Sequence, residues 1–287
     1  MTMDILELPD QFGFDKDMDL LRQSARRLLN ERSSMDAVRN LDTDELGYDV
    51  ALWKEMAELG WMGLALPESC GGAELGNLSL AIVLEEMGRR LLPGPFFNTA
   101  LAGLALVDAG ASDRCEAIAA GECIATIALS EPDGSWEPEH VSATADPADG
   151  GYALRGVKTH VMWGGSANLL VAPFKVGDDV ALFAVDLPRA GVTVEPEVCV
   201  DTTRRTARIR LDGARVDASA RLDGGLDDPN DDRRETAGNE AIDDCAYAED
   251  ISRPGNARRR EILKLHTMTL GRNHAVPVPG KKELDAR

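Results

Sequence analysis

The sequence is poor in aromatic residues and in positive charge. Phenylalanine, tryptophan and tyrosine make up 5% of the 287 residues, so the core must consist mainly of leucine, alanine, valine and isoleucine. With 50 acidic and 31 basic residues, the formal net charge is −19. Nucleic acids and anionic membrane surfaces are bound by clustered lysine and arginine, so this balance argues against both as partners. An anionic small molecule stays compatible, because a local pocket can be positive on an acidic protein.

Long apolar runs and patterned metal ligands are also missing. No stretch approaches the roughly 20 apolar residues that cross a bilayer, so no membrane span is expected. The acidic segment 1–14 lacks the basic and then apolar order of a signal peptide. The five cysteines include no CxxC pair, and the four histidines include no HxxxH or HExxH spacing. We therefore expect reduced thiols, no metal site and a cytoplasmic location.

Residues 1–121 have the hydrophobic period of helices. Their apolar side chains recur at steps of three and four, as on the buried face of a helix. Helices are expected over residues 17–32, 50–59, 77–90, 96–109 and 111–120. Glu85 and Glu86 are neighbours in the third helix, where adjacent side chains point about 100° apart and cannot share a proton. A solvated face is therefore favoured for this pair over acid–base chemistry, and the region is predicted to be an all-α domain.

Residues 122–225 change to short segments rich in β-forming residues. Strands are expected over residues 123–129, 152–154, 157–162, 169–174, 180–186, 192–194 and 206–211. Turns containing glycine or proline separate them, and no helix-length segment intervenes as a parallel crossover would require. The pattern predicts a small antiparallel β-barrel after the helical domain, which gives an α+β multidomain fold.

Residues 226–287 fit neither pattern. Their high charge and few large apolar side chains cannot offset the entropy of ordering the chain, which predicts a largely disordered tail. Only Glu261–Leu270 has a convincing helical period. The run Arg258–Arg260 is interpreted as a solvated charge cluster rather than a phosphate site.

Three segments of the helical region resemble the acyl-CoA dehydrogenase family. Residues 53–63, WKEMAELGWMG, are similar to a family helix that ends in ELGxxG. Residues 66–72, LPESCGG, are similar to the PExxGG turn, and residues 81–89, AIVLEEMGR, to the VxEExG helix. In the turn, Gly71 and Gly72 permit a sharp bend with positive φ.

Residues 128–135, ALSEPDGS, are similar to the family's TEPxxGS strand and loop, although this loop is one residue shorter. A strand that ends in such a loop leaves backbone N–H and C=O groups unpaired, and these can meet the polar edge of an isoalloxazine ring. By resemblance, Leu129 and Ser130 contact the flavin, and Ser135 contacts the CoA portion of the substrate. For Trp136, beside the loop, ligand contact and simple packing both stay open.

Residues 156–162, GVKTHVM, are similar to the family's GxKxWIT strand. In the family the tryptophan lies against the flavin, and the hydroxyl of the threonine hydrogen-bonds to the ring. The resemblance places His160, Val161 and Met162 in the cofactor site. His160 takes the position of the tryptophan, and Met162, which has no hydrogen-bond donor, takes the position of the hydroxyl.

The resemblance implies FAD-dependent α,β-dehydrogenation of an acyl-CoA thioester in fatty-acid or lipid metabolism. Electron-transfer flavoprotein is then the implied partner. In the family a C-terminal helical bundle follows the barrel and carries the catalytic glutamate. Residues 226–287 do not resemble that bundle. No catalytic residue is therefore assigned, and a truncated enzyme is expected.

Two alternatives stay open beside a truncated enzyme. The chain could be a non-catalytic binding or scaffold subunit that pairs with a full-length homologue in a homo- or hetero-oligomer, which the residues His160 and Met162 favour. It could also be a defective gene product, because the abrupt change of composition near Leu226 is what a shifted reading frame would produce.

Overall fold

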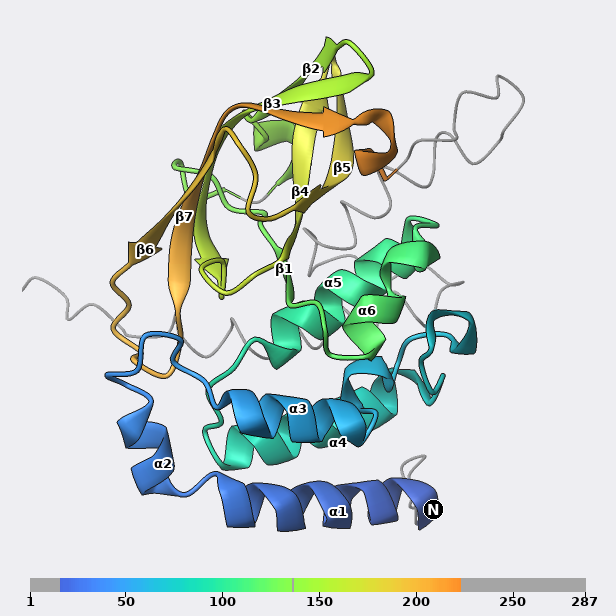
Figure 1. Ribbon diagram of the computed structural model, residues 1–287, viewed down its shortest axis with the longest axis vertical. Coiled ribbons are helices and arrows are strands. Elements are labelled where there is room, and N and C mark those ends of the chain that lie inside the picture. Colours follow the sequence, from blue (N-terminus) through green and yellow to red (C-terminus); the bar gives the residue numbers. More distant parts are fainter. Residues whose placement is uncertain (1–15, 136, 223–287) are drawn as a thin grey trace, which may run out of the picture.

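The computed structural model describes residues 16–135 and 137–222, in which helices come first and strands follow (Figure 1). The sheet lies at one end of the molecule, α5 and α6 lie next to it, and α1 lies farthest from it. The sequence-based expectations for Trp136 and for residues 226–287 lie outside the described residues.

The helical segments follow the predicted ones closely. The α-helices are α1 Lys16–Arg32, α2 Met35–Asn40, α3 Val50–Glu58, α4 Gly76–Arg89, α5 Phe96–Asp108 and α6 Glu116–Ala119. Short 3-10 turns lie at η1 Trp61–Gly63, η2 Glu68–Cys70, η3 Ser112–Arg114, η4 Pro138–His140 and η5 Ala218–Ala220. The sequence analysis missed α2, which Ser34 caps by accepting a hydrogen bond from the Ala37 N–H at 3.1 Å.

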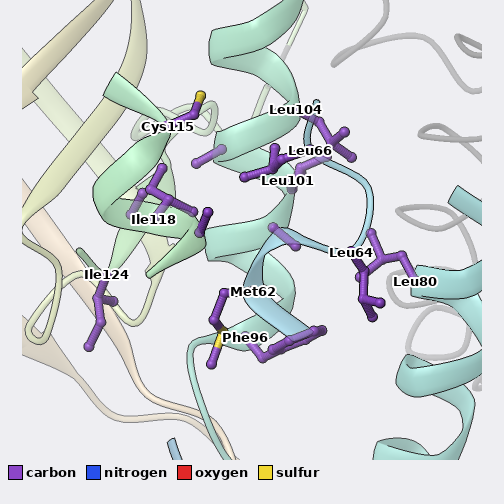
Figure 2. Close-up of a cluster of buried hydrophobic side chains, with 14 of the residues drawn as sticks. Met62, Leu64, Leu66, Leu80, Phe96, Leu101, Leu104, Cys115, Ile118 and Ile124 are labelled. Atoms are coloured by element: carbon purple, nitrogen blue, oxygen red, sulfur yellow. The ribbon is translucent and has the colours of Figure 1, made fainter. Parts of the chain in front are cut away.

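The core of the helical part surrounds α5. Its members come from α1, α3, α4, α5, α6 and the segment 61–70, and include Met62, Leu66, Leu80, Phe96, Leu101 and Ile118 (Figure 2). The same apolar cluster continues into the sheet through Ile124, Ala125 and Ile127. The helices and the sheet are therefore joined by one continuous core, and α5 packs directly on β1.

The glycines of the LPESCGG turn have a structural role. Gly71 has a φ of +71°, and a Cβ on Gly72 would lie 2.2 Å from the carbonyl oxygen of Leu66. Gly72 therefore has to be glycine for the chain to fold back on residues 63–66, where the Ala73 N–H donates to the Gly63 carbonyl at 2.9 Å.

Glu86 corrects the expectation of a solvated face. Glu85 is exposed, but the Glu86 side chain is 2% exposed and is turned toward α1. Arg26 donates to it through two nitrogens, at 3.0 and 2.7 Å. The helical period placed both carboxylates outward because a period does not record where a neighbouring helix crosses, and α1 packs against α4 at this point.

The strands form one curled mixed sheet rather than an antiparallel barrel. They are β1 Ala125–Ile127, β2 Thr144–Ala148, β3 Gly151–Met162, β4 Leu169–Val176, β5 Asp179–Asp186, β6 Val192–Glu197 and β7 Thr206–Asp217. Their order is β1-β4-β2-β3-β7-β6, and β5 pairs with β4 along its whole length, from Leu169 to Val176.

The antiparallel expectation is wrong at β1 and β4. These strands pair in parallel, with Ala125 opposite Leu169 and Ile127 opposite Val171. The expectation assumed that a parallel pair needs a helical crossover. Here the antiparallel hairpin of β2 and β3 is the crossover, since it carries the chain out and back before β4 begins.

β3 contains residues 156–162, the second of the two segments that the resemblance places in the cofactor site. It is continuous over 12 residues where two shorter strands were expected. Its pairing with β7 is interrupted between Lys158 and Val161, which marks a β-bulge.

Within the described residues, no helix is both long and apolar enough to cross a membrane.

Candidate functional site

The structure brings the loop 128–135 against the end of β3. The Thr159 N–H donates to the Ser130 carbonyl at 2.9 Å, and the Thr159 hydroxyl donates to the Glu131 carbonyl at 3.0 Å. Ser130 and His160, which come from different motifs, therefore lie on adjacent segments.

A buried ion pair fixes the base of this loop. Glu131 and Lys158 are almost fully buried, and the Lys158 ammonium lies 2.7 Å from a Glu131 oxygen. Glu131 also accepts from the Ala143 N–H at 3.1 Å and from the N–H and hydroxyl of Ser142. Lys158 lies 5.4 Å from the centre of the Phe174 ring. This carboxylate has four donors around it, so it anchors the loop.

The pKa values of this pair have opposing causes. Burial alone would raise the pKa of Glu131, but the charge of Lys158 and the hydrogen bonds from Lys158 and Ser142 lower it further than burial raises it. Burial lowers the pKa of Lys158, and Glu131 offsets this only in part. Glu131 is therefore an ionised anchor at neutral pH, unsuited to accept a proton from a substrate.

Leu129 and Ser130 offer free polar groups at the end of β1. Both residues are half-buried. Within residues 16–135 and 137–222, neither their backbone N–H groups nor the Ser130 hydroxyl has a hydrogen-bond partner. Unpaired donors at a half-buried strand end are a suitable donor set for the polar edge of a flavin ring.

His160 occupies the β-bulge. Its φ is +54°, and its side chain is exposed. Its N–H donates to a Glu197 oxygen at 2.9 Å, and the other oxygen of Glu197 accepts from Arg208 Nε at 3.5 Å. Glu197 thus holds the bulge, so the imidazole is directed away from the sheet core.

Val161 and Met162 face opposite sides, as alternation in a strand requires. Val161 is buried in the apolar core of the sheet, so its side chain is not available to a ligand. Met162 is half-buried, and its carbonyl accepts from the Thr126 hydroxyl at 2.6 Å. Of these two side chains, only that of Met162 lies outside the apolar core of the sheet.

Ser135 lies at the far side of the loop, and its hydroxyl is already engaged. It accepts from the Glu137 N–H at 3.2 Å and lies 2.9 Å from Nδ1 of His140. The Ser135 carbonyl accepts from the Glu131 N–H at 3.3 Å, so the shortened loop closes on itself. The hydroxyl that the resemblance assigns to the CoA portion is therefore already in contact with a histidine.

The sequence reasoning missed Glu131, Lys158 and Glu197. A signal existed for Lys158, because it lies in a strand at a position whose side chain points inward, where a charge requires a buried partner. No such signal marks Glu197, which acts on the backbone of His160. Over the described residues there is no cluster of His, Cys, Asp or Glu that could hold a metal ion.

Comparisons with known proteins agree with the sequence motifs. Residues 15–118 match the family model of the acyl-CoA dehydrogenase N-terminal domain. Acyl-CoA dehydrogenase IpdE2 of Mycolicibacterium smegmatis is 38% identical over 113 residues, which cover 39% of this chain and 36% of that protein. Benzylmalonyl-CoA dehydrogenase of Aromatoleum aromaticum is 28% identical over 212 residues, which cover 70% of this chain and 54% of that protein.

A solved structure extends the likeness through the sheet. A chain of the ChsE4–ChsE5 complex from Mycobacterium tuberculosis matches with a TM-score of 0.69 and 25% identity, over 81% of this chain and 60% of that one. The present chain spans 36% and 54% of the length of the two curated relatives. The candidate site at residues 129–162 lies beyond the segment that the family model matches.

Proposed function

This chain belongs to the acyl-CoA dehydrogenase family, and we propose that it binds FAD at the junction of Ser130 and Met162 for the α,β-dehydrogenation of an acyl-CoA thioester. The observation that carries the proposal is the half-buried Ser130 hydroxyl with N–H groups beside it that have no partner among the described residues, adjacent to the bulge of β3. When bound, FAD supplies the acceptor for the hydride that leaves the β carbon of the substrate.

The residues of this chain have three roles in the proposal. Leu129 and Ser130 donate hydrogen bonds to the polar edge of the flavin, and His160 lies over the ring from the bulge. Ser135, with His140 behind it, meets the CoA portion of the substrate. Electron-transfer flavoprotein is the proposed acceptor of the electrons.

Neither carboxylate near the site is suited to be the base. Glu131 is held by four donors, and Glu197 is held by His160 and Arg208. A base must be free to accept the α proton of the substrate. We therefore assign the base to a group outside the described residues.

Flavin binding by the purified full-length chain tests the proposal. The chain is saturated with FAD, passed through a gel-filtration column, and examined for the visible absorption of bound flavin. We expect bound flavin in the wild type, and Ser130→Ala should weaken FAD binding by about three- to tenfold, which corresponds to one lost hydrogen bond. Ser112→Ala, a half-buried serine of η3 in the helical part, is the matched control. Absence of bound flavin, or equal effects of the two substitutions, contradicts the proposal.

A second candidate function is a subunit that supports a full-length homologue. The similar structure from Mycobacterium tuberculosis is that of the ChsE4–ChsE5 complex. His160 and Met162 replace the aromatic and hydroxyl side chains of the resembled motif, which favours a site with less catalytic power. Bound flavin and turnover that appear only when the chain is co-expressed with such a homologue, and never with the chain alone, support this alternative.

A further inference from the structure

Arg205, at the start of β7, reaches from the sheet to the helical part. Its guanidinium donates to four backbone carbonyls, those of Leu41 at 2.9 Å, Asp42 at 2.9 Å, Asp44 at 3.3 Å and Thr202 at 2.8 Å. Three of these carbonyls belong to the loop that follows α2. In Figure 1 this loop rises from α2 toward the beginning of β7.

The loop is shaped for this guanidinium. Leu41 caps the C-terminus of α2, and Asp42 and Asp44 follow it, so the guanidinium binds carbonyls that lie just past the end of a helix, where a cation is favoured. A Cβ on Gly47 would lie 2.6 Å from Nε of Arg205, so any larger residue there would have to displace the guanidinium from its four carbonyls. Arg205 therefore occupies a built site rather than a chance surface contact.

Arg205 is also joined to the candidate flavin segment. Its carbonyl accepts from the Trp163 N–H at 2.7 Å, and Trp163 directly follows Met162. The Trp163 ring is buried and meets the Tyr48 ring edge-on at 5.8 Å between centroids. Tyr48 follows Gly47, so the loop 41–48 contacts the end of β3 from two sides, through Arg205 and through Trp163.

The end of β3 requires such support. His160 and Trp163 have φ values of +54° and +57°, in the left-handed region that residues with a Cβ rarely adopt. Conformations of this kind cost on the order of 1 kcal/mol each and persist where the surroundings fix them. Glu197 holds the N–H of His160, while Arg205 and Tyr48 hold the peptide and ring of Trp163.

We propose that Arg205 is a positioning residue for the flavin edge, acting through Trp163 to fix the segment that carries His160 and Met162. The inference rests on the proposed FAD site and adds to it a residue that lies outside the motifs. If the segment leaves its fixed conformation in some molecules, those molecules cannot bind FAD. The apparent FAD affinity then falls in proportion to the fraction of molecules that can still bind it. The loop 41–48 thus acts as an anchor that couples the helical part to the cofactor site.

The test compares two arginines that each bridge the helices and the sheet in the full-length chain. Arg205→Met removes the donors and keeps the aliphatic stem, and Arg205→Lys keeps the charge but cannot reach three carbonyls as a fork. Arg114→Met is the matched control, because Arg114 of η3 pairs with Asp186 of β5 at 3.4 Å and has no contact with Trp163. The readouts are amide hydrogen exchange and the FAD dissociation constant, with far-UV circular dichroism to verify folding.

We expect Arg205→Met to speed exchange at the Trp163 and His160 amides and to weaken FAD binding by roughly tenfold. Arg205→Lys should lie between that variant and the wild type, which keeps the test decisive if Arg205→Met fails to fold. Arg114→Met should change neither readout at the site. Equal effects of the Arg205 and Arg114 variants would make Arg205 a general link between helices and sheet, and would overturn the proposal.

The two proposals fail in different ways. If the wild-type chain retains no FAD, the proposed function is wrong, and exchange at Trp163, which needs no ligand, still decides whether Arg205 fixes the segment. If FAD binds and Arg205→Met leaves both its affinity and the Trp163 exchange unchanged, the positioning role alone is wrong.

Discussion

The guanidinium of Arg205 packs against Gly47 at the junction of the helices and the sheet, and it occupies the position that a side chain at residue 47 would need. A Cβ on Gly47 would lie 2.6 Å from the Nε of Arg205. Gly47 also has a φ of +72°, so two separate causes require glycine at this position. The two causes can be separated by experiment, since only one of them depends on Arg205.

The first prediction is a coupling between these two residues. Gly47→Ala should destabilise the chain both by backbone strain, roughly 1 kcal/mol, and by collision with the guanidinium. In an Arg205→Ala background the collision is gone, so Gly47→Ala should cost about 1 kcal/mol less there. The measurement is urea unfolding of the two single variants and the double variant, followed by circular dichroism.

Gly60 is the control for this cycle. It has a φ of +75°, and nothing lies within 4 Å of a Cβ built on it. Gly60→Ala should therefore carry the backbone strain alone and be additive with Arg205→Ala. If Gly47 and Gly60 give the same coupling energy with Arg205, the close contact between Gly47 and Arg205 does not affect stability.

The second prediction concerns the buried pair, where the two partners should not be equivalent. Glu131→Gln leaves the Lys158 ammonium buried without a counter-charge, which should destabilise the chain by about 3–5 kcal/mol. Lys158→Met leaves Glu131 with its donors from Ser142 and Ala143, so its cost should be smaller. The urea midpoints of both variants give the comparison.

The double variant Glu131→Gln/Lys158→Met checks the cause. With the charge of Lys158 removed, glutamine at position 131 no longer faces an unpaired ion. The double variant should therefore be more stable than Glu131→Gln alone. A double variant as unstable as the sum of the singles would show that the ion pair is not the source of the loss.

The third prediction compares the neighbours Glu86 and Glu85 on α4. Glu86→Gln should cost about 1–2 kcal/mol, because it weakens the charge-assisted hydrogen bonds that the buried Glu86 carboxylate accepts from the partly exposed Arg26. Glu85→Gln should change stability by about 0.5 kcal/mol or less, because Glu85 is exposed and solvent screens its pairing with Arg22. Thermal and urea unfolding near neutral pH measure the difference.

The loss from Glu86→Gln should depend on pH. The hydrogen bond from Arg26 lowers the pKa of Glu86 more than burial raises it, and Arg89 and Arg22 add to the effect. Since the folded pKa lies below the unfolded value of roughly 4.3, the stabilisation is fully present above that value. It is lost as the pH falls through the folded pKa, so wild type and Glu86→Gln should converge in acid. A gap that stays constant down to that range contradicts the ionic cause.

The helical part was largely predictable because its signal is local. The apolar period of residues 17–32 and 96–109 needs only near neighbours along the chain, and α1 and α5 lie where it placed them. The parallel pairing of β1 with β4 was not predictable from such a signal. It depends on which strands meet after the hairpin of β2 and β3 has formed. Glu86 was misplaced for the same reason, since its partner lies on another helix.

The sequence predicted which segments form the candidate site. It did not predict which residues hold those segments in place. The motifs placed Ser130 and His160 in one site, and the structure puts their segments side by side. The roles of Glu197 and Arg205 could not be predicted, because each acts on backbone groups of a distant segment, and every residue has such groups. Whether Leu129, Ser130, His160, Val161, Met162 and Ser135 bind ligands stays a prediction.

The fourth prediction concerns Met162, which stands where the resembled family motif has a threonine. Met162 is half-buried, its carbonyl accepts from the Thr126 hydroxyl, and its side chain has no donor where the resembled motif has a hydroxyl. Met162→Thr should restore one donor toward the flavin and tighten FAD binding by about three- to tenfold, the equivalent of one hydrogen bond. Met35→Thr, an exposed methionine on α2, is the control and should leave FAD binding unchanged. If both substitutions leave the dissociation constant unchanged while the wild type binds FAD, the Met162 side chain does not face the ring, and the flavin lies against β1 alone.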